Sequence, residues 1–346
     1  MTGRLGPVRA FLKKYGHDGL LVTAEANVRY LSGFSGTECR LLITATAAFF
    51  LGDFRYLLQA EKEVSKEFEI VRVDTSFAAS LAQLFLKLKI RNLCFEEHHL
   101  TVGVFNRLRE LFKKTIRFIP TSGIVEHQRQ VKTSDEIACL RKAAAITRQA
   151  LRKLQPLIKP GVSELALKHR LEQYITSLGA EGPSFDSIVA SGPNGAMPHA
   201  KTTDRRIRAH EPVIVDCGAI VNGYKSDLTR TFFSGNMTQY AHYYRLVETA
   251  QKQAIQHVRP GRMIGAIDRA ARQVFENANV AEYFGHALGH GVGLEVHEAP
   301  TINSANRQRL RSGVVITIEP GLYMPKWGGI RIEDMVLVTR NGYEVV

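Results

Sequence analysis

The pattern of apolar and polar residues differs between the first 120 or so residues and the rest of the chain. Up to about residue 120, short apolar runs alternate with amphipathic stretches that have helical spacing. The run 41–51 is either a strand hairpin or one long buried strand. The other predicted elements of this part are helices at 9–15 and 54–68 and strands at 19–23, 69–73 and 92–95. This alternation is typical of a three-layer α/β domain in which both faces of the sheet are covered.

The rest of the chain has longer helical stretches, and its strands are typical of an antiparallel sheet. Thr133 and Glu136 have the spacing of a capping box, which predicts a helix from there to about residue 158. The other expected elements are helices at 163–179, 239–256 and 263–277 and strands at 185–190, 212–220, 223–233, 314–319 and 329–338. We therefore predict an α+β fold with two domains. An N-terminal α/β domain spans 1–122, and a larger domain with strands inside and helices outside spans 130–346.

The composition excludes several classes of protein. The 346 residues are 45% hydrophobic and 23% charged, which is ordinary for a globular protein. The formal net charge is +13, but the basic residues are dispersed, without the basic arm or stripe of a nucleic-acid-binding protein. No apolar run reaches the length of about 18 residues that suggests a membrane span. The charged N-terminus lacks the apolar core of a signal peptide, so we expect a cytoplasmic protein.

Five potential metal ligands follow one another in the last third of the chain: Asp216, Asp227, His290, Glu319 and Glu333. Four are carboxylates in apolar runs that are predicted to be strands, where a charged group is costly to bury without a partner. Buried carboxylates that lie close together also repel one another unless positive charge lies among them. The simplest source of that charge is a pair of divalent metal ions, an arrangement that hydrolytic enzymes use.

The spacing of the two aspartates predicts where they lie in a hairpin. Asn222-Gly223 is a strong signal for a two-residue turn. With that turn, residue 221 pairs with residue 224, and Asp216 pairs with Thr229. Asp227 then lies on the same sheet face as Asp216, diagonally across the two strands. We expect both carboxylates to point toward the same metal pair.

The two glutamates both follow apolar stretches. Strand alternation places Thr317 on the face of Glu319, and Arg331 on the face of Glu333. A single glutamate at the end of a strand is more often solvated than bound to an ion. Apolar neighbours on both sides favour the binding of an ion here.

Three histidines, His286, His290 and His297, lie in one glycine-rich segment. Its glycines disfavour a continuous helix and permit a close approach of the backbone to a ligand. Each histidine taken alone is more often a structural polar residue than a ligand. The His-Glu-x-x-His motif of single-zinc peptidases is absent. One imidazole among four carboxylates suits Mn²⁺ or Co²⁺ better than structural Zn²⁺ and argues against Ca²⁺ or Mg²⁺ alone.

Short motifs surround these residues. They are Ser191-Gly-Pro-Asn-Gly-Ala-Met-Pro-His199, Asp216-x10-Asp227, His290-x6-His297, Ile318-Glu-Pro-Gly321 and Gly329-Ile-Arg-Ile-Glu-Asp334. With them the chain resembles the pita-bread metallopeptidases, a family that includes methionine aminopeptidase, Xaa-Pro aminopeptidase, Xaa-Pro dipeptidase (prolidase) and creatinase. The resemblance covers residues 125–346. Residues 1–120 resemble the N-terminal domain of the proline-specific branch through Asn27-Val-Arg-Tyr-Leu-Ser-Gly-Phe-Ser-Gly36 and Asp53-Phe-Arg-Tyr56.

The resemblance implies how the five ligands share two divalent ions. Asp216 would hold one ion, His290 and Glu319 the other, and Asp227 and Glu333 would bridge both. Mn²⁺ is the expected metal, with Co²⁺ or Zn²⁺ as alternatives. A hydroxide that bridges the ions would attack the peptide bond, and Glu319 would accept its proton.

The same resemblance implies roles for five other side chains. His297 and His199 would stabilise the oxyanion that develops on the scissile carbonyl, and His199 would also help to position the substrate. His286 would line the prolyl pocket. Arg331 would support Glu333, and Tyr323 would contact the substrate.

Two features favour the proline-specific branch. One is the N-terminal domain, which most methionine aminopeptidases lack, and the other is the 14-residue spacing between Glu319 and Glu333. We predict an Xaa-Pro aminopeptidase that acts on peptides with proline at the second position, with an Xaa-Pro dipeptidase as the alternative. A non-catalytic homologue that binds peptides or nucleic acid is disfavoured, because such proteins usually lose metal ligands. The resemblance implies a homodimer, and no membrane partner is expected.

Overall fold

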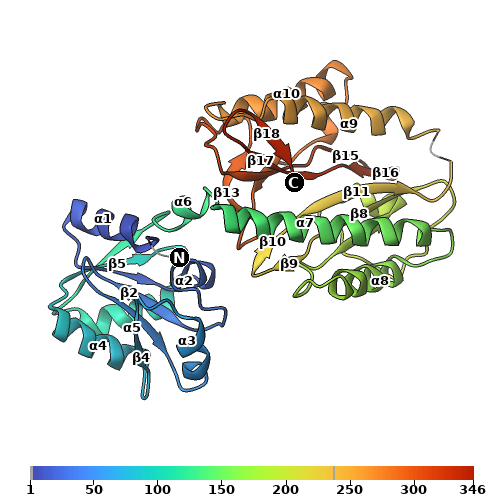
Figure 1. The fold of residues 1–346 in the computed structure, drawn as a ribbon. Coiled ribbons are helices and arrows are strands. Elements are labelled where there is room, and N and C mark those ends of the chain that lie inside the picture. The colour runs from blue at the N-terminus through green and yellow to red at the C-terminus, as the bar shows by residue number, and fades with distance from the viewer. Residues whose placement is uncertain (1–2, 237) are drawn as a thin grey trace. The chain divides into compact units, whose positions relative to one another are not determined.

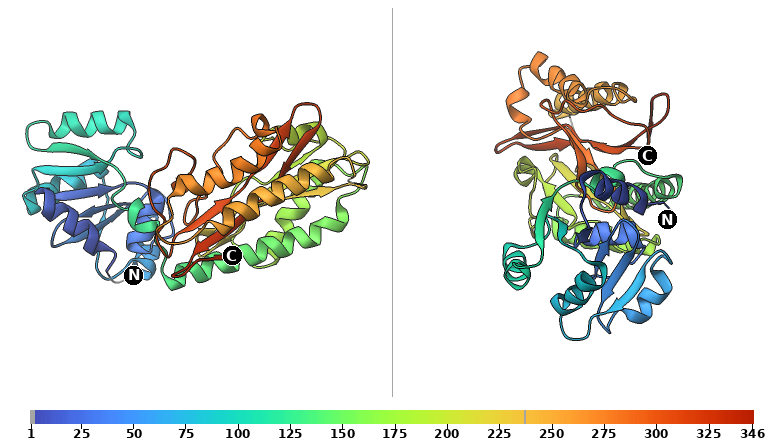
Figure 2. Two further views of the ribbon diagram at one scale, coloured as in Figure 1. Left: turned by 90° about the horizontal axis from the view of Figure 1, so that it is seen from above. Right: turned by 90° about the vertical axis from the view of Figure 1, so that its left-hand side faces the viewer.

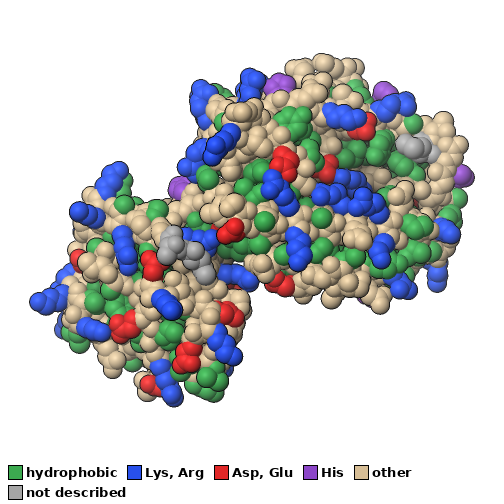
Figure 3. All heavy atoms as spheres, in the orientation of Figure 1, with side chains coloured by type: hydrophobic (Ala, Val, Ile, Leu, Met, Phe, Trp, Pro, Cys, Tyr) green, Lys and Arg blue, Asp and Glu red, His purple; other side chains and the backbone are tan. Residues whose placement is uncertain are grey.

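The computed structural model describes residues 3–236 and 238–346 and divides into two compact units, Met1–Arg129 and Gln130–Val346 (Figure 1). Each unit has its own hydrophobic core. Within the described ranges, no helix is long and apolar enough to cross a membrane. Lysine and arginine side chains are spread over the face drawn in Figure 3, with acidic side chains between them.

A six-stranded mixed sheet forms the first unit, in the order β4-β3-β2-β1-β5-β6. β2 pairs antiparallel with β1 and with β3, whereas the other neighbours are parallel. The apolar run 41–51 is therefore a hairpin of two strands. The strands are β1 (Gly19–Val22), β2 (Arg40–Ile43), β3 (Ala48–Gly52), β4 (Glu69–Arg72), β5 (Asn92–Glu96) and β6 (Arg117–Thr121).

Helices pack against this sheet. Leu21, Phe49 and Phe95 share a core cluster with residues of α4 and α5, whereas α1 and α2 contact β1 and β2. The helices are α1 (Leu5–Tyr15), α2 (Glu25–Ser32), α3 (Leu57–Glu63), α4 (Phe77–Leu88), α5 (Val102–Phe112) and α6 (Glu126–Arg129). α3 is shorter than the helix predicted at 54–68. It ends because Val64 is extended, with φ −68° and ψ 130°, and the N–H of Ser65 donates to the carbonyl of Ser32.

Short strands, mostly antiparallel, form the centre of the second unit. One sheet has the order β11-β8-β7, a second has the order β13-β12-β14-β17-β18, and β9–β10 and β15–β16 are two-stranded ribbons. The strands are β7 (Ile188–Ser191), β8 (Pro212–Cys217), β9 (Ile220–Val221), β10 (Tyr224–Lys225), β11 (Leu228–Phe233), β12 (Gly289–Gly291), β13 (Glu298–Ile302), β14 (Val315–Ile318), β15 (Gly321–Met324), β16 (Gly328–Arg331), β17 (Asp334–Val338) and β18 (Tyr343–Val345).

Two pairs of long helices lie on opposite sides of these strands, as Figure 1 and Figure 2 show. One core cluster joins the first pair to β8 and β11, and a second joins the other pair to β14, β15, β16 and β17. β14 contributes to both, because Val315 lies in the first cluster and Ile316 in the second. The pairs are α7 (Ser134–Leu154) with α8 (Glu164–Ser177), and α9 (Ala241–Gln256) with α10 (Ile264–Asn277).

The start of α7 has the predicted capping box. The Thr133 hydroxyl accepts from the N–H of Glu136, and the Glu136 carboxylate accepts from the N–H of Thr133. The helix ends at Leu154, earlier than predicted, and a 3-10 turn, η1 (Gln155–Leu157), follows. Pro156 lies in this turn and has no N–H to continue the helical hydrogen bonds.

Three of the predicted long strands are interrupted. β8 ends at Cys217. The next residue, Gly218, lies so close to the segment before β11 that a Cβ atom there would be 1.8 Å from the carbonyl oxygen of Ser226. The Ser226 hydroxyl accepts from the N–H of Ala219 at 2.9 Å, where a continuous hairpin would have a ladder bond. Asp227 and Glu333 both lie in such interruptions, outside the named strands.

Candidate metal centre and active site

The hairpin that carries the two aspartates has the predicted register. Asp216 in β8 lies opposite Thr229 in β11, and Val221 lies opposite Tyr224 across the turn. Asp227 lies in the interruption between β10 and β11, and only 5% of its surface is exposed. Both carboxylates line the same cavity. The local hairpin geometry therefore brings them together, as their parity predicted.

Two glycines place His290. It lies between Gly289 and Gly291 in β12, and β12 pairs with β13 and β14. A Cβ atom at Gly289 would be 2.1 Å from the carbonyl oxygen of Thr317, and one at Gly291 would be 2.3 Å from that of Ala299. The close approach that these two glycines permit in the structure is to the neighbouring strands.

Backbone hydrogen bonds connect both glutamates to the segments that carry other predicted ligands. Glu319 directly follows β14, and its N–H donates to the carbonyl of Leu288 at 2.8 Å, next to β12. Glu333 lies between β16 and β17, and its N–H donates to the carbonyl of Thr229 at 3.1 Å. These bonds bring both carboxylates to the cavity lined by the aspartates.

All five predicted ligands line one cavity of about 700 Å³. His290 Nε2 lies 3.6 Å from Asp227 Oδ2 and 3.5 Å from Glu319 Oε1. Ligand atoms of Asp227, His290 and Glu333 all lie within 4.8 Å of one another. Two ligands at about 2.1 Å from a tetrahedral ion are roughly 3.4 Å apart. The separations in the cavity therefore suit a shared divalent ion.

The donor atoms fit a cation. Among the described residues, Asp216 Oδ1 and Glu333 Oε1 are buried without a hydrogen-bond partner, a costly state for a carboxylate. His290 Nδ1 lies 3.0 Å from the Gly291 carbonyl, which can only accept. Nδ1 therefore carries the proton, and the lone pair of Nε2 faces the carboxylates.

The electrostatics of the cavity agree with this fit. Burial and then the neighbouring carboxylates raise the pKa of Asp227 and of Glu333 well above the usual range. Burial raises the pKa of Glu319 to about 8 and lowers the pKa of His290 to about 4. The imidazole of His290 is thus neutral at pH 7, and its Nε2 can donate an electron pair to a metal ion. Divalent cations would offset the cost of ionising the three carboxyl groups.

Arg331 connects three parts of the site. Its Nη2 donates to Asp216 Oδ2 at 2.7 Å, and its Nε donates to the Thr229 hydroxyl at 3.0 Å. That hydroxyl in turn donates to Glu333 Oε2 at 2.8 Å. The support that the resemblance implied for Glu333 therefore runs through Thr229, and the direct contact is with Asp216. Sequence reasoning did not single out Thr229, although its pairing opposite Asp216 was the signal that could have found it.

His286 lines the cavity, and hydrogen bonds to neighbouring residues orient its ring. Its Nδ1 lies 2.7 Å from the Ala287 carbonyl, so Nε2 accepts from the Tyr323 hydroxyl at 3.0 Å. That hydroxyl accepts from Arg331 Nη1 at 3.0 Å. Arg272 Nη2 donates to the carbonyl of His286 at 2.6 Å. Tyr323 is not part of the cavity wall, so its expected contact with substrate would pass through His286 or Arg331.

The two other predicted histidines also reach the cavity. The ring centroid of His297 lies 4.2 Å from that of His290, and burial lowers the pKa of His297. His199 is exposed and lies on the loop after β7. Together with His286, these rings line the wall around the carboxylates. The arrangement offers three further imidazoles beside a candidate metal centre.

Comparison with known protein families identifies both units. Residues 138–340 match metallopeptidase family M24, and residues 4–131 match the Creatinase/Prolidase N-terminal domain. The chain therefore belongs to metallopeptidase family M24. It is a metal-dependent hydrolase with a pita-bread catalytic domain, as its motifs predicted.

Individual relatives match along nearly the whole chain. The Xaa-Pro dipeptidase of Pyrococcus horikoshii is 35% identical over 99% of this chain and 96% of its own length. The solved structure of an Xaa-Pro dipeptidase from Bacillus anthracis has a TM-score of 0.95 at 37% identity, covering 99% of this chain and 96% of that chain. The X-Pro aminopeptidase from Thermotoga maritima has a TM-score of 0.88 at 33% identity and covers 95% of each chain. The predicted fold class and the resemblance to the proline-specific branch are thereby confirmed.

Proposed function

We propose that this chain hydrolyses the peptide bond that precedes proline and uses two divalent metal ions to do so. One observation carries the proposal: five metal-ligand side chains and three histidines line a single cavity. The full-length similarity to an Xaa-Pro dipeptidase and an X-Pro aminopeptidase supports the choice of bond.

The proposed centre holds Mn²⁺, with Co²⁺ or Zn²⁺ as alternatives. Asp216 would hold one ion, His290 and Glu319 would hold the other, and Asp227 and Glu333 would be shared between them. The unpartnered oxygen atoms of Asp216 and Glu333 support this assignment. The bound ions supply Lewis acidity and lower the pKa of water. Elemental analysis of protein dialysed against each metal should give two ions per chain.

The side chains around the ions have separate proposed tasks. Glu319 accepts a proton and delivers it to the prolyl nitrogen as the bond breaks. Its pKa of about 8 falls when positive charge lies beside it, toward a range where a carboxylate both accepts and releases a proton. His297 and His199 stabilise the charge that develops on the carbonyl oxygen. His286, held by Tyr323, contacts the prolyl ring.

An Xaa-Pro dipeptide is the better supported substrate, because the relative with a TM-score of 0.95 is an Xaa-Pro dipeptidase. This reverses the order of our prediction from sequence, in which the aminopeptidase came first. A longer peptide with proline at the second position is the second candidate. The cavity of about 700 Å³ favours it, because pockets of this size hold ligands larger than a dipeptide.

A three-substrate assay tests the proposal. Metal-free protein is reloaded with Mn²⁺, Co²⁺ or Zn²⁺ and given an Xaa-Pro dipeptide, the matching Xaa-Pro-Yaa tripeptide and the matching Xaa-Ala dipeptide. We expect kcat/KM for Xaa-Pro to exceed that for the tripeptide and for Xaa-Ala by at least about tenfold. A faster tripeptide would favour the aminopeptidase. No hydrolysis with any metal, or no preference for proline, would overturn the proposal.

A further inference from the structure

His199 depends on its backbone for its position. It lies on the loop 192–211 between β7 and β8, and its side chain is exposed. Within the described parts of the chain, the imidazole has no hydrogen bond or ion pair that would fix it. Whatever holds the loop therefore also determines where the ring enters the cavity.

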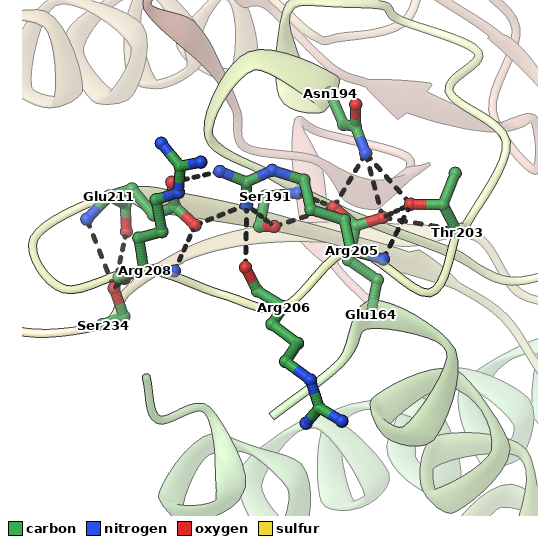
Figure 4. Close-up of polar contacts among 9 residues, drawn as sticks. All are labelled: Glu164, Ser191, Asn194, Thr203, Arg205, Arg206, Arg208, Glu211 and Ser234. Atoms are coloured by element: carbon green, nitrogen blue, oxygen red, sulfur yellow. Dashed lines mark hydrogen bonds and ion pairs between the residues drawn. The ribbon is translucent and has the colours of Figure 1, made fainter. Parts of the chain in front are cut away.

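Glu164 holds one side of this loop. It is the first residue of α8, and its side chain is fully buried, with 0% exposure. The carboxylate accepts hydrogen bonds from Ser191, Asn194 and Thr203, which lie on both sides of His199 in sequence (Figure 4). Its place at a helix N-terminus also stabilises the negative charge. One buried side chain thus ties the two ends of the segment 191–203 together.

Each oxygen of the carboxylate has a backbone partner of its own. Oε1 accepts from the N–H and the hydroxyl of Ser191, both at 2.7 Å. Oε2 accepts from the N–H of Thr203 at 3.1 Å and from its hydroxyl at 2.7 Å. The amide of Asn194 reaches both oxygens at 3.1 Å. All these partners donate, so the group they select is a carboxylate with two accepting oxygens.

An ion pair extends the network along the loop. Arg205 donates to the Ser191 hydroxyl at 2.5 Å and pairs with Glu211 through two contacts of 2.6 and 2.8 Å (Figure 4). Gly192 lies against this pair, because a Cβ atom there would be 2.3 Å from Glu211 Oε2. The Ser234 hydroxyl accepts from the N–H of Glu211 at 3.2 Å. The start and the end of the loop are therefore packed together.

On its other side, the loop is attached to the candidate metal centre. Arg331 Nη1 donates to the carbonyl of Pro198, directly before His199, at 3.1 Å. Gly195 and Gly329 also touch, because a Cβ atom at Gly329 would be 1.9 Å from the carbonyl oxygen of Gly195. The histidine thus lies between one anchor at Arg331 and another at Glu164.

We infer that Glu164 is a positioning residue for the hydrolysis, which acts through His199 by fixing the segment 191–203. This inference rests on the proposed function, which gives His199 its contact with the substrate. Glu164 is not part of the cavity wall, and among the described residues its carboxylate bonds to Ser191, Asn194 and Thr203 and to none of the five proposed metal ligands. Its effect is therefore on the placement of one ring and not on metal binding.

Glu164→Gln is a sharp test, because the amide cannot replace the carboxylate in either orientation. Its NH₂ group must face the backbone N–H of Ser191 or that of Thr203, and neither N–H can turn away. We expect kcat/KM for Xaa-Pro to fall on the order of a hundredfold, with an unchanged number of bound metal ions. Thr203→Val is the milder variant, because it leaves the carboxylate in place. It removes a hydroxyl that donates to Glu164 and accepts from the Asn194 amide and the N–H of Arg205.

Glu136→Gln is the matched control. Glu136 is also buried, at 4% exposure, lies in the first turn of a helix in the same unit, and accepts from the Tyr224 hydroxyl at 2.6 Å. It does not line the cavity. Its substitution should lower the melting temperature by a similar amount and leave kcat/KM unchanged. A similar loss of kcat/KM in both variants would mean that Glu164 acts only through general stability.

A double-mutant cycle separates a positioning role through His199 from a general structural effect. In a His199→Ala background, Glu164→Gln and Thr203→Val should each change kcat/KM by less than about twofold, because their route to the substrate is gone. The same loss in both backgrounds would overturn the inference while leaving the proposed function intact. A wild-type protein without Xaa-Pro activity would overturn the proposed function instead.

Hydrogen–deuterium exchange on metal-free protein gives a readout without activity. Amides of the segment 191–203 should exchange faster in Glu164→Gln than in wild type, and those of the strand pair β14–β17 should not. Glu136→Gln should leave the segment protected. Unchanged protection of the segment in both Glu164→Gln and Thr203→Val would refute the anchoring role.

Discussion

Arg331 and Asp216 form a buried ion pair in which Nη2 lies 2.7 Å from Oδ2, with side-chain exposures of 4% and 14%. The same guanidinium donates to Thr229 and to Tyr323. One planar side chain therefore orients two hydroxyl groups: that of Thr229, which donates to the candidate metal ligand Glu333, and that of Tyr323, which bonds to His286 in the cavity wall. An ammonium group has no such fork of donors.

For this reason, Arg331→Lys should lower both kcat/KM and the apparent metal affinity by roughly 10- to 100-fold. Steady-state rates measured across a titration of Mn²⁺ would separate the two effects. Arg141→Lys is the control, because Arg141 pairs with Glu344 at 2.6 Å on the exposed surface of the same unit. An Arg331→Lys enzyme that behaves like the Arg141→Lys enzyme would contradict the role of the guanidinium.

Asp227→Asn should abolish metal loading and turnover together. Asp227 is buried, and its carboxylate lies 3.6 Å from His290 Nε2 in the cluster that suits an ion. An amide offers one neutral oxygen in place of a charged carboxylate. Elemental analysis and the Xaa-Pro assay on the same sample measure both losses. Full activity with a full complement of metal would exclude a bridging role for Asp227.

Gly289→Ala should displace His290 and destabilise the second unit. The added methyl group would lie 2.1 Å from the carbonyl oxygen of Thr317, which is backbone and cannot move aside alone. We expect a loss of about 1–3 kcal/mol in the free energy of unfolding, together with weaker metal binding. Gly182→Ala is the control, because a Cβ atom there meets nothing within 4 Å. Denaturant unfolding of the two variants decides the prediction, and equal stabilities would refute it.

The metal-free protein should lose stability as the pH rises from about 6.5 to about 8. Glu319 has a pKa of about 8 in the folded protein against an ordinary value of 4.5, so the folded state holds a proton that the unfolded chain releases. The free energy of unfolding therefore falls with rising pH in that interval. Below pH 6.5 the buried His286 and His290, with pKa values of about 4, act in the opposite direction. Between pH 6.5 and 8 the loss from Glu319 alone is up to about 2 kcal/mol.

Thermal denaturation in a chelator measures this slope. Saturating Mn²⁺ should remove or reverse it, because the ions bind the deprotonated carboxylates. Glu319→Gln should flatten it in the metal-free protein. A metal-free wild-type protein whose stability is constant or rises from pH 6.5 to 8 would show that the carboxyl groups are not held protonated.

Features with a local cause could be predicted from the sequence. Asn222-Gly223 was sufficient for the register that pairs Asp216 with Thr229, because turn geometry sets hairpin pairing. The capping box of α7 is equally local. The breaks in the two strands of this hairpin lie where Gly218 approaches Ser226. They depend on contacts between the strands, so the local sequence of neither strand predicted them. The contact of Arg331 with Asp216 joins residues 115 positions apart and needs the whole unit to form.

Adjacent residues of β14 enter different hydrophobic clusters, Val315 on one side and Ile316 on the other. The same alternation holds for Met335 and Val336 in β17. The two clusters therefore cannot separate without breaking strands that both of them share. We expect residues 130–346 to unfold as one cooperative block, with a single calorimetric transition rather than one for each helix pair. A catalytic centre built across such strands keeps its geometry until the entire block melts.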